Sequence, residues 1–153
     1  TVETLFEGIT VANAICFSPD GKSAHYTDTP TQQVMRVALD AEGWPIGTGE
    51  VFVDTRAEGF FPDGAVVDAV GCLWVAHWGH SRVARYDQSG GFIGAVAVPA
   101  KRTTCPAFGG DDLYTLYVTT ATMGMGDRAG PHDGQTFVIE TEAKGQREHR
   151  VIL

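Results

Sequence analysis

DAVGCLWVAHWGHSRVARYD, residues 68–87, is the stretch that decides the fold, because an earlier segment repeats its pattern. SPDGKSAHYTDTPTQQVMRVAL, residues 18–39, has the same order of features: a turn with glycine, a short apolar and aromatic strand, a polar turn, and a strand with an arginine. Arg36 of the earlier copy corresponds to Arg85 of the later one. A third, more degenerate copy begins at TCPAFGGDDLYTLYVTT, residues 104–120. The chain is therefore predicted to be built from structural repeats.

Turn residues and alternating apolar positions predict three groups of four short strands, and no segment has the periodicity of a convincing helix. The predicted strands are 12–17, 24–28, 33–39 and 50–54; 64–68, 73–77, 82–86 and 92–98; and 104–108, 116–120, 135–140 and 147–152. One further predicted strand, TVETLF at residues 1–6, precedes these three groups and belongs to none of them. Four antiparallel strands in a repeat of about 40–50 residues are typical of a β-propeller blade.

These repeats predict an all-β fold in a single domain, residues 1–153. It contains three four-stranded antiparallel blades, at about 12–54, 64–98 and 104–152, and the strand at 1–6 belongs to a preceding or partner blade. Propellers typically have about four to eight blades, so three blades are interpreted as half of a six-bladed propeller. A half-ring leaves two apolar blade faces uncovered. We therefore expect either a homodimer that closes a six-bladed ring about a two-fold axis or a missing N-terminal half.

The composition argues against several classes of partner. The 153 residues carry a net charge of −8 and show no basic patch, which disfavours nucleic acid and anionic membranes. No apolar run is long enough to span a membrane, and no signal peptide is recognised. The three cysteines, Cys16, Cys72 and Cys105, match neither a zinc motif nor a disulfide framework. They predict reduced, buried thiols in a cytoplasmic protein.

The segment FFPDGAVVDAVG, residues 60–71, places Asp63 between Pro62 and Gly64, directly before an apolar, β-branched run. Proline, aspartate and glycine are the usual residues of a turn, so Asp63 has a local structural explanation. A carboxylate at the mouth of a strand is also a suitable ligand for a divalent cation. The residues alone leave both interpretations open.

Three segments resemble the gluconolactonase/regucalcin family, also called the senescence marker protein family, in their order and spacing. They are VANAICFSPDG…YTDTPTQQVMRV, FPDGAVVDAVGCLWVAHWGHSRVARYD and TCPAFGGDDLYTLYVTT. The resemblance covers nearly the whole chain and corresponds to the C-terminal half of the family's six-bladed propeller. It implies metal-dependent hydrolysis of a sugar lactone. The strings P-D-G and T-C-P-A-F-G-G argue against a strictosidine-synthase-like or paraoxonase-like propeller enzyme.

The resemblance also implies a site. One divalent ion is expected in the central channel, with Asn13 and Asp63 among its ligands. The resemblance leaves calcium, zinc, manganese and magnesium as alternatives. Asp63 is in addition the family's candidate for the general base. The third ligand, a glutamate, and the residues that bind the substrate belong to the N-terminal half. A non-catalytic half-propeller that oligomerises or binds a partner is therefore the alternative function.

Other polar residues are weaker candidates. Thr103 and Thr104 begin the third inner strand at the place where the two metal-ligand candidates begin theirs, so both are candidates for contact with a substrate. The histidines that fall on strands or turns expected to form the blade bodies are His25, His77 and His80. The glycine-rich segment 120–134 is long for a blade loop, and such loops often roof a propeller channel.

Overall fold

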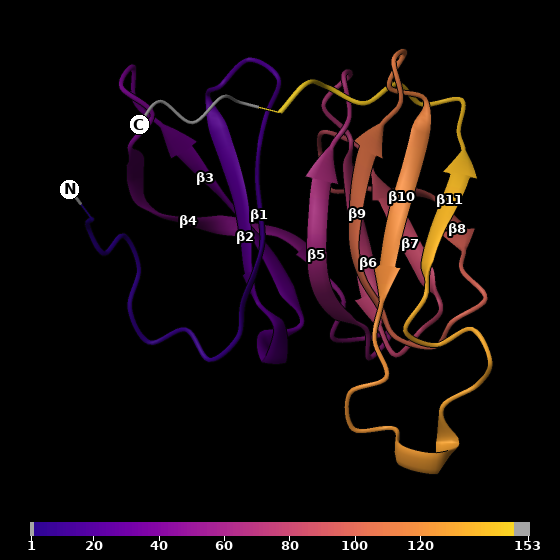
Figure 1. Ribbon diagram of the computed structural model, residues 1–153. Coiled ribbons are helices and arrows are strands. Elements are labelled where there is room, and N and C mark those ends of the chain that lie inside the picture. Colours follow the sequence, from indigo (N-terminus) through magenta and orange to yellow (C-terminus); the bar gives the residue numbers. More distant parts are fainter. Residues whose placement is uncertain (1, 149–153) are drawn as a thin grey trace.

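The computed structural model describes residues 2–148, which form three antiparallel sheets that follow one another along the chain (Figure 1). The first sheet contains β1 (Ala12–Phe17), β2 (Ser23–Asp28), β3 (Gln33–Leu39) and β4 (Pro45–Asp54). The second contains β5 (Phe61–Val67), β6 (Leu73–Trp78), β7 (Arg82–Tyr86) and β8 (Phe92–Ala97). The third contains β9 (Thr103–Gly109), β10 (Thr115–Thr120) and β11 (Thr136–Glu140). Two single turns of 3-10 helix, η1 (Thr29–Thr31) and η2 (Gly126–Arg128), complete the elements.

Within each sheet, strands that are consecutive in the sequence are hydrogen-bonded neighbours. The predicted all-β architecture of repeated antiparallel blades is confirmed. β4 and β5 each begin several residues before the predicted start, so Asp63 lies inside a strand rather than in front of one. In the described residues, no helix has the length and apolar character needed to cross a membrane.

Two predicted strands are not found as expected. Residues 2–6 form no strand, because a strand needs a hydrogen-bonded neighbour and nothing in the described chain pairs with this segment. Phe6 instead stacks on Tyr26 of β2, with the ring centroids 4.6 Å apart. The predicted strand at 147–152 lies mostly outside the described residues, and residues 147 and 148 are not in a strand.

The second sheet lies between the other two, with β1 next to β5 and β5 next to β9 (Figure 1). Alternation along β6 directs Leu73 and Val75 toward the first sheet and Trp74 toward the third. The core between the first two sheets consists of Cys16, Val34, Val53, Val67, Leu73, Val75, Ala84 and Tyr86. The core between the second and third consists of Val66, Trp74, Val83, Val98, Ala100, Leu116 and Val118.

The outward faces of the first and third sheets are covered by no further sheet in residues 2–148. Ile15 is 65% exposed and Val51 is 47% exposed on the first sheet, and Val138 is 64% exposed on the third. Each alternates with residues that face the core, as the two-residue period of a strand requires. These two apolar surfaces are the uncovered blade faces that the sequence predicts.

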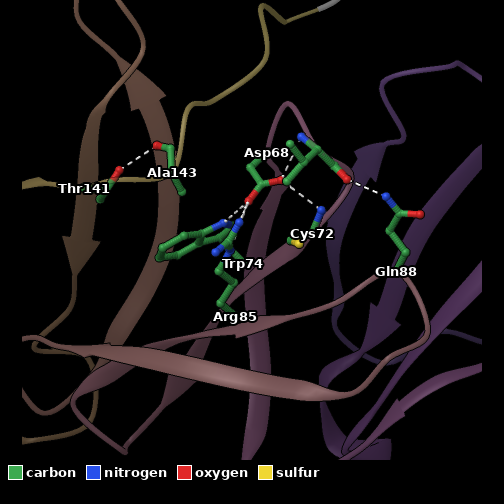
Figure 2. Close-up of polar contacts among 8 residues, drawn as sticks. Asp68, Cys72, Trp74, Arg85, Gln88, Thr141 and Ala143 are labelled. Carbon is green, nitrogen blue, oxygen red and sulfur yellow. Dashed lines mark hydrogen bonds and ion pairs between the residues drawn. The ribbon is translucent and has the colours of Figure 1, made fainter.

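The turn between β5 and β6 contains a buried carboxylate (Figure 2). Asp68 is fully buried, and its Oδ1 accepts hydrogen bonds from the backbone nitrogens of Val70 at 3.1 Å and Cys72 at 2.9 Å. Its Oδ2 accepts from Trp74 Nε1 at 3.0 Å. Arg85 donates to the same oxygen through Nε at 3.0 Å and through Nη2 at 2.6 Å. One side chain therefore joins the turn to both β6 and β7.

Candidate functional site

The inner strands of the three sheets, β1, β5 and β9, each carry a break in register near their first residues. The pairing of β1 with β2 shifts between Asn13 and Cys16, and that of β5 with β6 shifts between Pro62 and Ala65. The pairing of β9 with β10 shifts next to Thr103. Such β-bulges redirect side chains away from the regular alternation and are common next to functional sites. All three inner strands therefore begin with irregular backbone.

Asn13 is half-buried at the start of β1, and a single hydroxyl connects it to β5. Its Nδ2 donates a hydrogen bond to Thr29 Oγ1 at 3.1 Å. Thr29 Oγ1 in turn donates to the carbonyl oxygen of Pro62 at 2.8 Å. Ala14 follows with a φ of 57°, a left-handed conformation that non-glycine residues rarely adopt. The structure therefore brings Asn13 close to the backbone that precedes Asp63.

Asp63 is half-buried within the bulge of β5. Burial raises the pKa of its carboxyl to about 6, although a hydrogen bond from the Gly64 backbone opposes this shift. No ion pair in residues 2–148 involves Asp63. A carboxylate that is partly desolvated and has no cationic partner is a suitable place for a metal cation.

Gly64 allows β5 and β9 to approach each other. A Cβ atom at this position would lie 2.7 Å from both Cβ and Sγ of Cys105, and 2.7 Å from the carbonyl oxygen of Thr104. Distances below about 3.0 Å are not tolerated between such atoms. The glycine beside Asp63 therefore has a packing function between neighbouring inner strands.

The two threonines at the start of β9 have different surroundings. Thr103 is fully buried, and its Oγ1 lies 2.9 Å and 3.0 Å from the carbonyl oxygens of His77 and Arg82, so it links the third sheet to the second. Thr104 is only half-buried, and its Oγ1 lies 2.6 Å from Thr119 Oγ1. Of the two, Thr104 is the residue that has access to solvent.

His25 and His77 belong to the blade interiors. His77 Nδ1 accepts a hydrogen bond from Arg82 Nε at 3.0 Å, so Nε2 carries the proton and donates to Tyr86 Oη at 3.2 Å. His25 is also buried, and neither of its ring nitrogens has a hydrogen-bond partner among the described residues. Desolvation lowers the pKa of His25 to about 4 and that of His77 to about 3, so both rings are neutral at pH 7. His80 is exposed and lies edge-on to Phe60.

The three cysteines are free thiols. Cys16 and Cys72 are buried as predicted, whereas Cys105 on β9 is exposed. Burial raises the pKa of each thiol above its usual value. The neutral thiols are therefore poor metal ligands.

The donor set fits a divalent cation as part of a larger coordination shell. Asn13 Oδ1 takes no hydrogen bond within residues 2–148, so it is free to act as a ligand together with the Asp63 carboxylate. Amide and carboxylate oxygens suit calcium, magnesium and manganese, and also zinc. No group of three or more His, Cys, Asp or Glu side chains that could hold a metal occurs in the described part of the chain.

The loop between β10 and β11 extends beyond the end of the molecule at which β5 and β9 begin, and η1 lies at the same end (Figure 1). It is anchored by Asp133, whose Oδ1 accepts from the Lys101 backbone at 2.6 Å and whose Oδ2 accepts from Gly130 at 2.8 Å. Met125 is buried, whereas Met123 is 72% exposed. The glycine-rich segment thus lies at the end that carries the candidate ligands.

Thr29 is the polar residue that the sequence analysis missed. The only available signal is a difference between the two repeats: Thr29 directly follows β2, whereas Gly79 directly follows β6. The first blade, which also supplies Asn13, therefore has a threonine side chain with its hydroxyl at the position where the second blade has a glycine.

The fold and the site define a member of a family of propeller proteins. The family model described as "SMP-30/Gluconolactonase/LRE-like region" matches residues 1–122, and the chain belongs to this family. The three sheets are therefore three successive blades, and they form half of a six-bladed β-propeller.

Similar proteins include a pentonolactonase from Haloferax volcanii, which is 36% identical over 157 residues, and an L-arabinolactonase from Azospirillum brasilense, which is 36% identical over 143 residues. These matches cover 98% and 92% of this chain, and 54% and 47% of the relatives. The crystal structure of a calcium-binding protein, regucalcin, from Agrobacterium tumefaciens has a TM-score of 0.91 and 44% identity, over 97% of this chain and 52% of that one. The chain thus spans about half the length of these relatives.

Proposed function

We propose that this chain supplies half of the ring of a metal-dependent lactonase that hydrolyses a sugar lactone. The observation that carries the proposal is the coupling of Asn13 and Asp63: Asn13 borders the bulge of β1, Asp63 lies in the bulge of the neighbouring strand β5, and Thr29 connects Asn13 to the backbone next to Asp63. The relatives that act on pentonolactones and arabinolactone support a sugar lactone as substrate. The calcium-binding relative supports an oxygen-ligated divalent cation, although calcium, zinc, manganese and magnesium all suit the two donors.

The residues of this chain have distinct roles in the proposed reaction. A divalent cation bound between Asn13 and Asp63 would polarise the lactone carbonyl. Asp63 is proposed to accept the proton of the attacking water as well as to bind the cation. Partial burial raises the pKa of its carboxyl to about 6 in the metal-free chain, and a bound cation acts in the opposite direction. Thr104, whose hydroxyl is half-buried and paired with Thr119, is the candidate for contact with a sugar hydroxyl.

Metal binding tests the role of Asp63 directly. We expect Asp63→Ala to raise the Kd for Mn²⁺ at least about tenfold, because the change removes one of two protein ligands and the only carboxylate of the pair. Asp20→Ala is the matched control, since Asp20 occupies the same Pro-Asp-Gly sequence in an exposed turn. Calorimetric titration of the metal-free chain measures both constants. Unchanged Mn²⁺ affinity in Asp63→Ala would contradict the proposal.

Hydrolysis requires the remaining ligand and the substrate-binding residues. A chimera that joins the N-terminal half of the Agrobacterium relative to this chain is expected to release protons from a pentono- or gluconolactone only when a divalent metal is present. The same chimera with Asp63→Ala is expected to lose this activity. Full metal-dependent hydrolysis by the alanine variant would exclude Asp63 as ligand and base.

The uncovered faces of the outer blades favour ring closure by a second copy of this chain. Ile15 and Val51 on the first sheet and Tyr117 and Val138 on the third are all more than 40% exposed. Light scattering is expected to give a mass near twice 16.4 kDa, with each copy supplying three blades. A strictly monomeric chain at micromolar concentration would rule out this dimer and leave an N-terminal half as the completing unit. A stable dimer without activity on any lactone would favour the non-catalytic half-propeller instead.

The charge and the cysteines support a cytoplasmic location. The net charge of −8 disfavours binding to nucleic acid or to anionic membranes. The three free thiols suit a reducing compartment, in which disulfides are rare. The proposed partners are therefore a small sugar lactone and the protein unit that completes the ring.

A further inference from the structure

Hydrogen-bond direction determines how Asn13 is oriented. The carbonyl oxygen of Pro62 can only accept, so the hydroxyl of Thr29 must donate its single hydrogen to it. The same hydroxyl can then only accept from Asn13, which places the Nδ2 group against Thr29. Oδ1 of Asn13 is consequently turned away from Thr29. A backbone carbonyl of β5 thus sets the orientation of a side chain on β1.

We propose that Thr29 is a positioning residue for the metal centre: it holds Asn13 with Oδ1 free to bind a cation and ties this ligand to the segment that carries Asp63. The cation-binding part of this inference rests on the proposed function, whereas the orientation of the amide does not. Thr29 itself contacts no reacting atom in this scheme. It acts through Asn13 and through the Pro62 carbonyl.

The backbone around Thr29 is held firmly enough for this task. The Asp28 carboxylate accepts hydrogen bonds from the backbone nitrogens of Thr10 at 3.1 Å and Val11 at 2.8 Å. The backbone nitrogen of Thr29 donates to the Val11 carbonyl at 3.1 Å. The dipeptide Asp28–Thr29 therefore fixes the chain just before Asn13 as well as the Asn13 side chain.

The two hydrogen bonds from Asn13 to Thr29 and from Thr29 to the Pro62 carbonyl also require an amide rather than a carboxylate at position 13. A carboxylate in place of Asn13 has no hydrogen to give to Thr29, whose own hydrogen is already used by Pro62. Asn13→Asp would therefore leave one oxygen without a donor or break the bond to the Pro62 carbonyl. Outer-shell groups of this kind commonly change metal affinity by about 10–100-fold when they are removed.

Asn13 is the only asparagine in the 153 residues, which makes the proposal directly measurable. Side-chain ¹⁵N-labelled asparagine gives one amide pair in a proton–nitrogen spectrum of the metal-free chain. In the wild-type chain, one of the two Nδ2 protons is expected to exchange with water at least about tenfold more slowly than the other. Thr29→Val is expected to abolish this difference, and Thr29→Ser to retain it.

A second measurement follows Mn²⁺ affinity in the same proteins. Thr29→Val is expected to raise the Kd for Mn²⁺ about tenfold, and Thr29→Ser to leave it within about twofold of the wild-type value. Thr31→Val is the matched control, because Thr31 is an exposed threonine of the same turn whose hydroxyl donates only to the Asp28 carbonyl, at 2.8 Å. It is expected to change neither the amide spectrum nor the affinity.

The two measurements separate failure of this inference from failure of the proposed function. Two Asn13 amide protons that exchange at equal, unprotected rates in the wild-type chain would overturn the role of Thr29 without any variant. An amide spectrum that is unaffected by Thr29→Val would do the same. A wild-type chain that shows the protected proton but binds no Mn²⁺ would sustain the orienting relay and refute the metal site of the proposed function.

Discussion

Replacement of Asp68 by alanine is expected to lower the free energy of unfolding by about 3–5 kcal/mol. Removing one partner of a buried ion pair leaves the other charge uncompensated, and this cost is about 3–5 kcal/mol where the pair is well buried. Here Asp68 is fully buried, and Arg85 retains 27% side-chain exposure. The loss also leaves Trp74 Nε1 and two backbone nitrogens without their acceptor.

Urea unfolding at pH 7 measures this loss. Asp20→Ala is the matched control, because Asp20 accepts hydrogen bonds from Ser18 Oγ at 2.7 Å and from the Lys22 backbone at 3.1 Å in a turn that is exposed. The control is expected to cost less than about 1 kcal/mol. Asp68→Asn is expected to lie between the two, since it keeps an acceptor but removes the charge. A loss below about 1 kcal/mol for Asp68→Ala would show that the network of Figure 2 contributes little to stability.

The second large effect is a loss of stability at low pH. We expect the free energy of unfolding to fall by about 2–3 kcal/mol for each of His25 and His77 as the pH is lowered from 6.5 to about 4. Burial lowers the pKa of the two rings to about 4 and about 3, below the ordinary value of 6.5. Between these values the unfolded chain binds protons that the folded chain does not bind. Stability is therefore fully present above pH 6.5 and is lost as the pH falls through this window.

The position of His25 allows a clean test of this effect. Its ring nitrogens have no hydrogen-bond partner in residues 2–148, so His25→Leu removes the titration without breaking a bond. Urea midpoints measured from pH 7 to pH 4.5 are expected to fall less steeply in His25→Leu than in the wild-type chain, while the raised pKa of Asp63, about 6, acts in the opposite direction in both proteins. His132→Gln, at an exposed loop position, is expected to leave the slope unchanged. An unaltered slope in His25→Leu would assign the acid sensitivity to other groups.

The repeated sheets were predictable because their signals are local. Turn glycines and alternating apolar residues define each hairpin without reference to the rest of the chain. The strand expected at 1–6 shows the limit of this reasoning, since a strand exists only where another segment pairs with it. Its apolar residue Phe6 packs on Tyr26 without joining the sheet.

Corresponding positions in the two repeats did not predict the interactions of their side chains. Arg36 and Arg85 occupy corresponding positions, but Arg85 binds the buried Asp68 whereas Arg36 binds the exposed Glu50 at 2.6 Å. The reason lies in the preceding turn, where the first repeat has Ser18 in place of the aspartate. A shared pattern of turns and strands therefore predicted the backbone but not the interactions of the two arginines.

The candidate site was predictable in its residues but not in its geometry. Asn13 and Asp63 were named through the family resemblance, but the register shifts beside Asn13 and around Asp63 were not predicted. Ala14 adopts a φ of 57° although nothing in its side chain favours that conformation. The relay through Thr29 depends on the approach of β1 to β5, which is a tertiary feature.

The order of the strands has a consequence for synthesis on the ribosome. Each sheet consists only of consecutive strands, so the first can close before the second has been translated. Translation proceeds at roughly 5–20 residues per second, so the core-facing side of the first sheet has no partner for a few seconds. The second sheet then covers that side, and the third covers β6 from the other side. The molecule can thus be assembled one layer at a time, in the direction in which it is made.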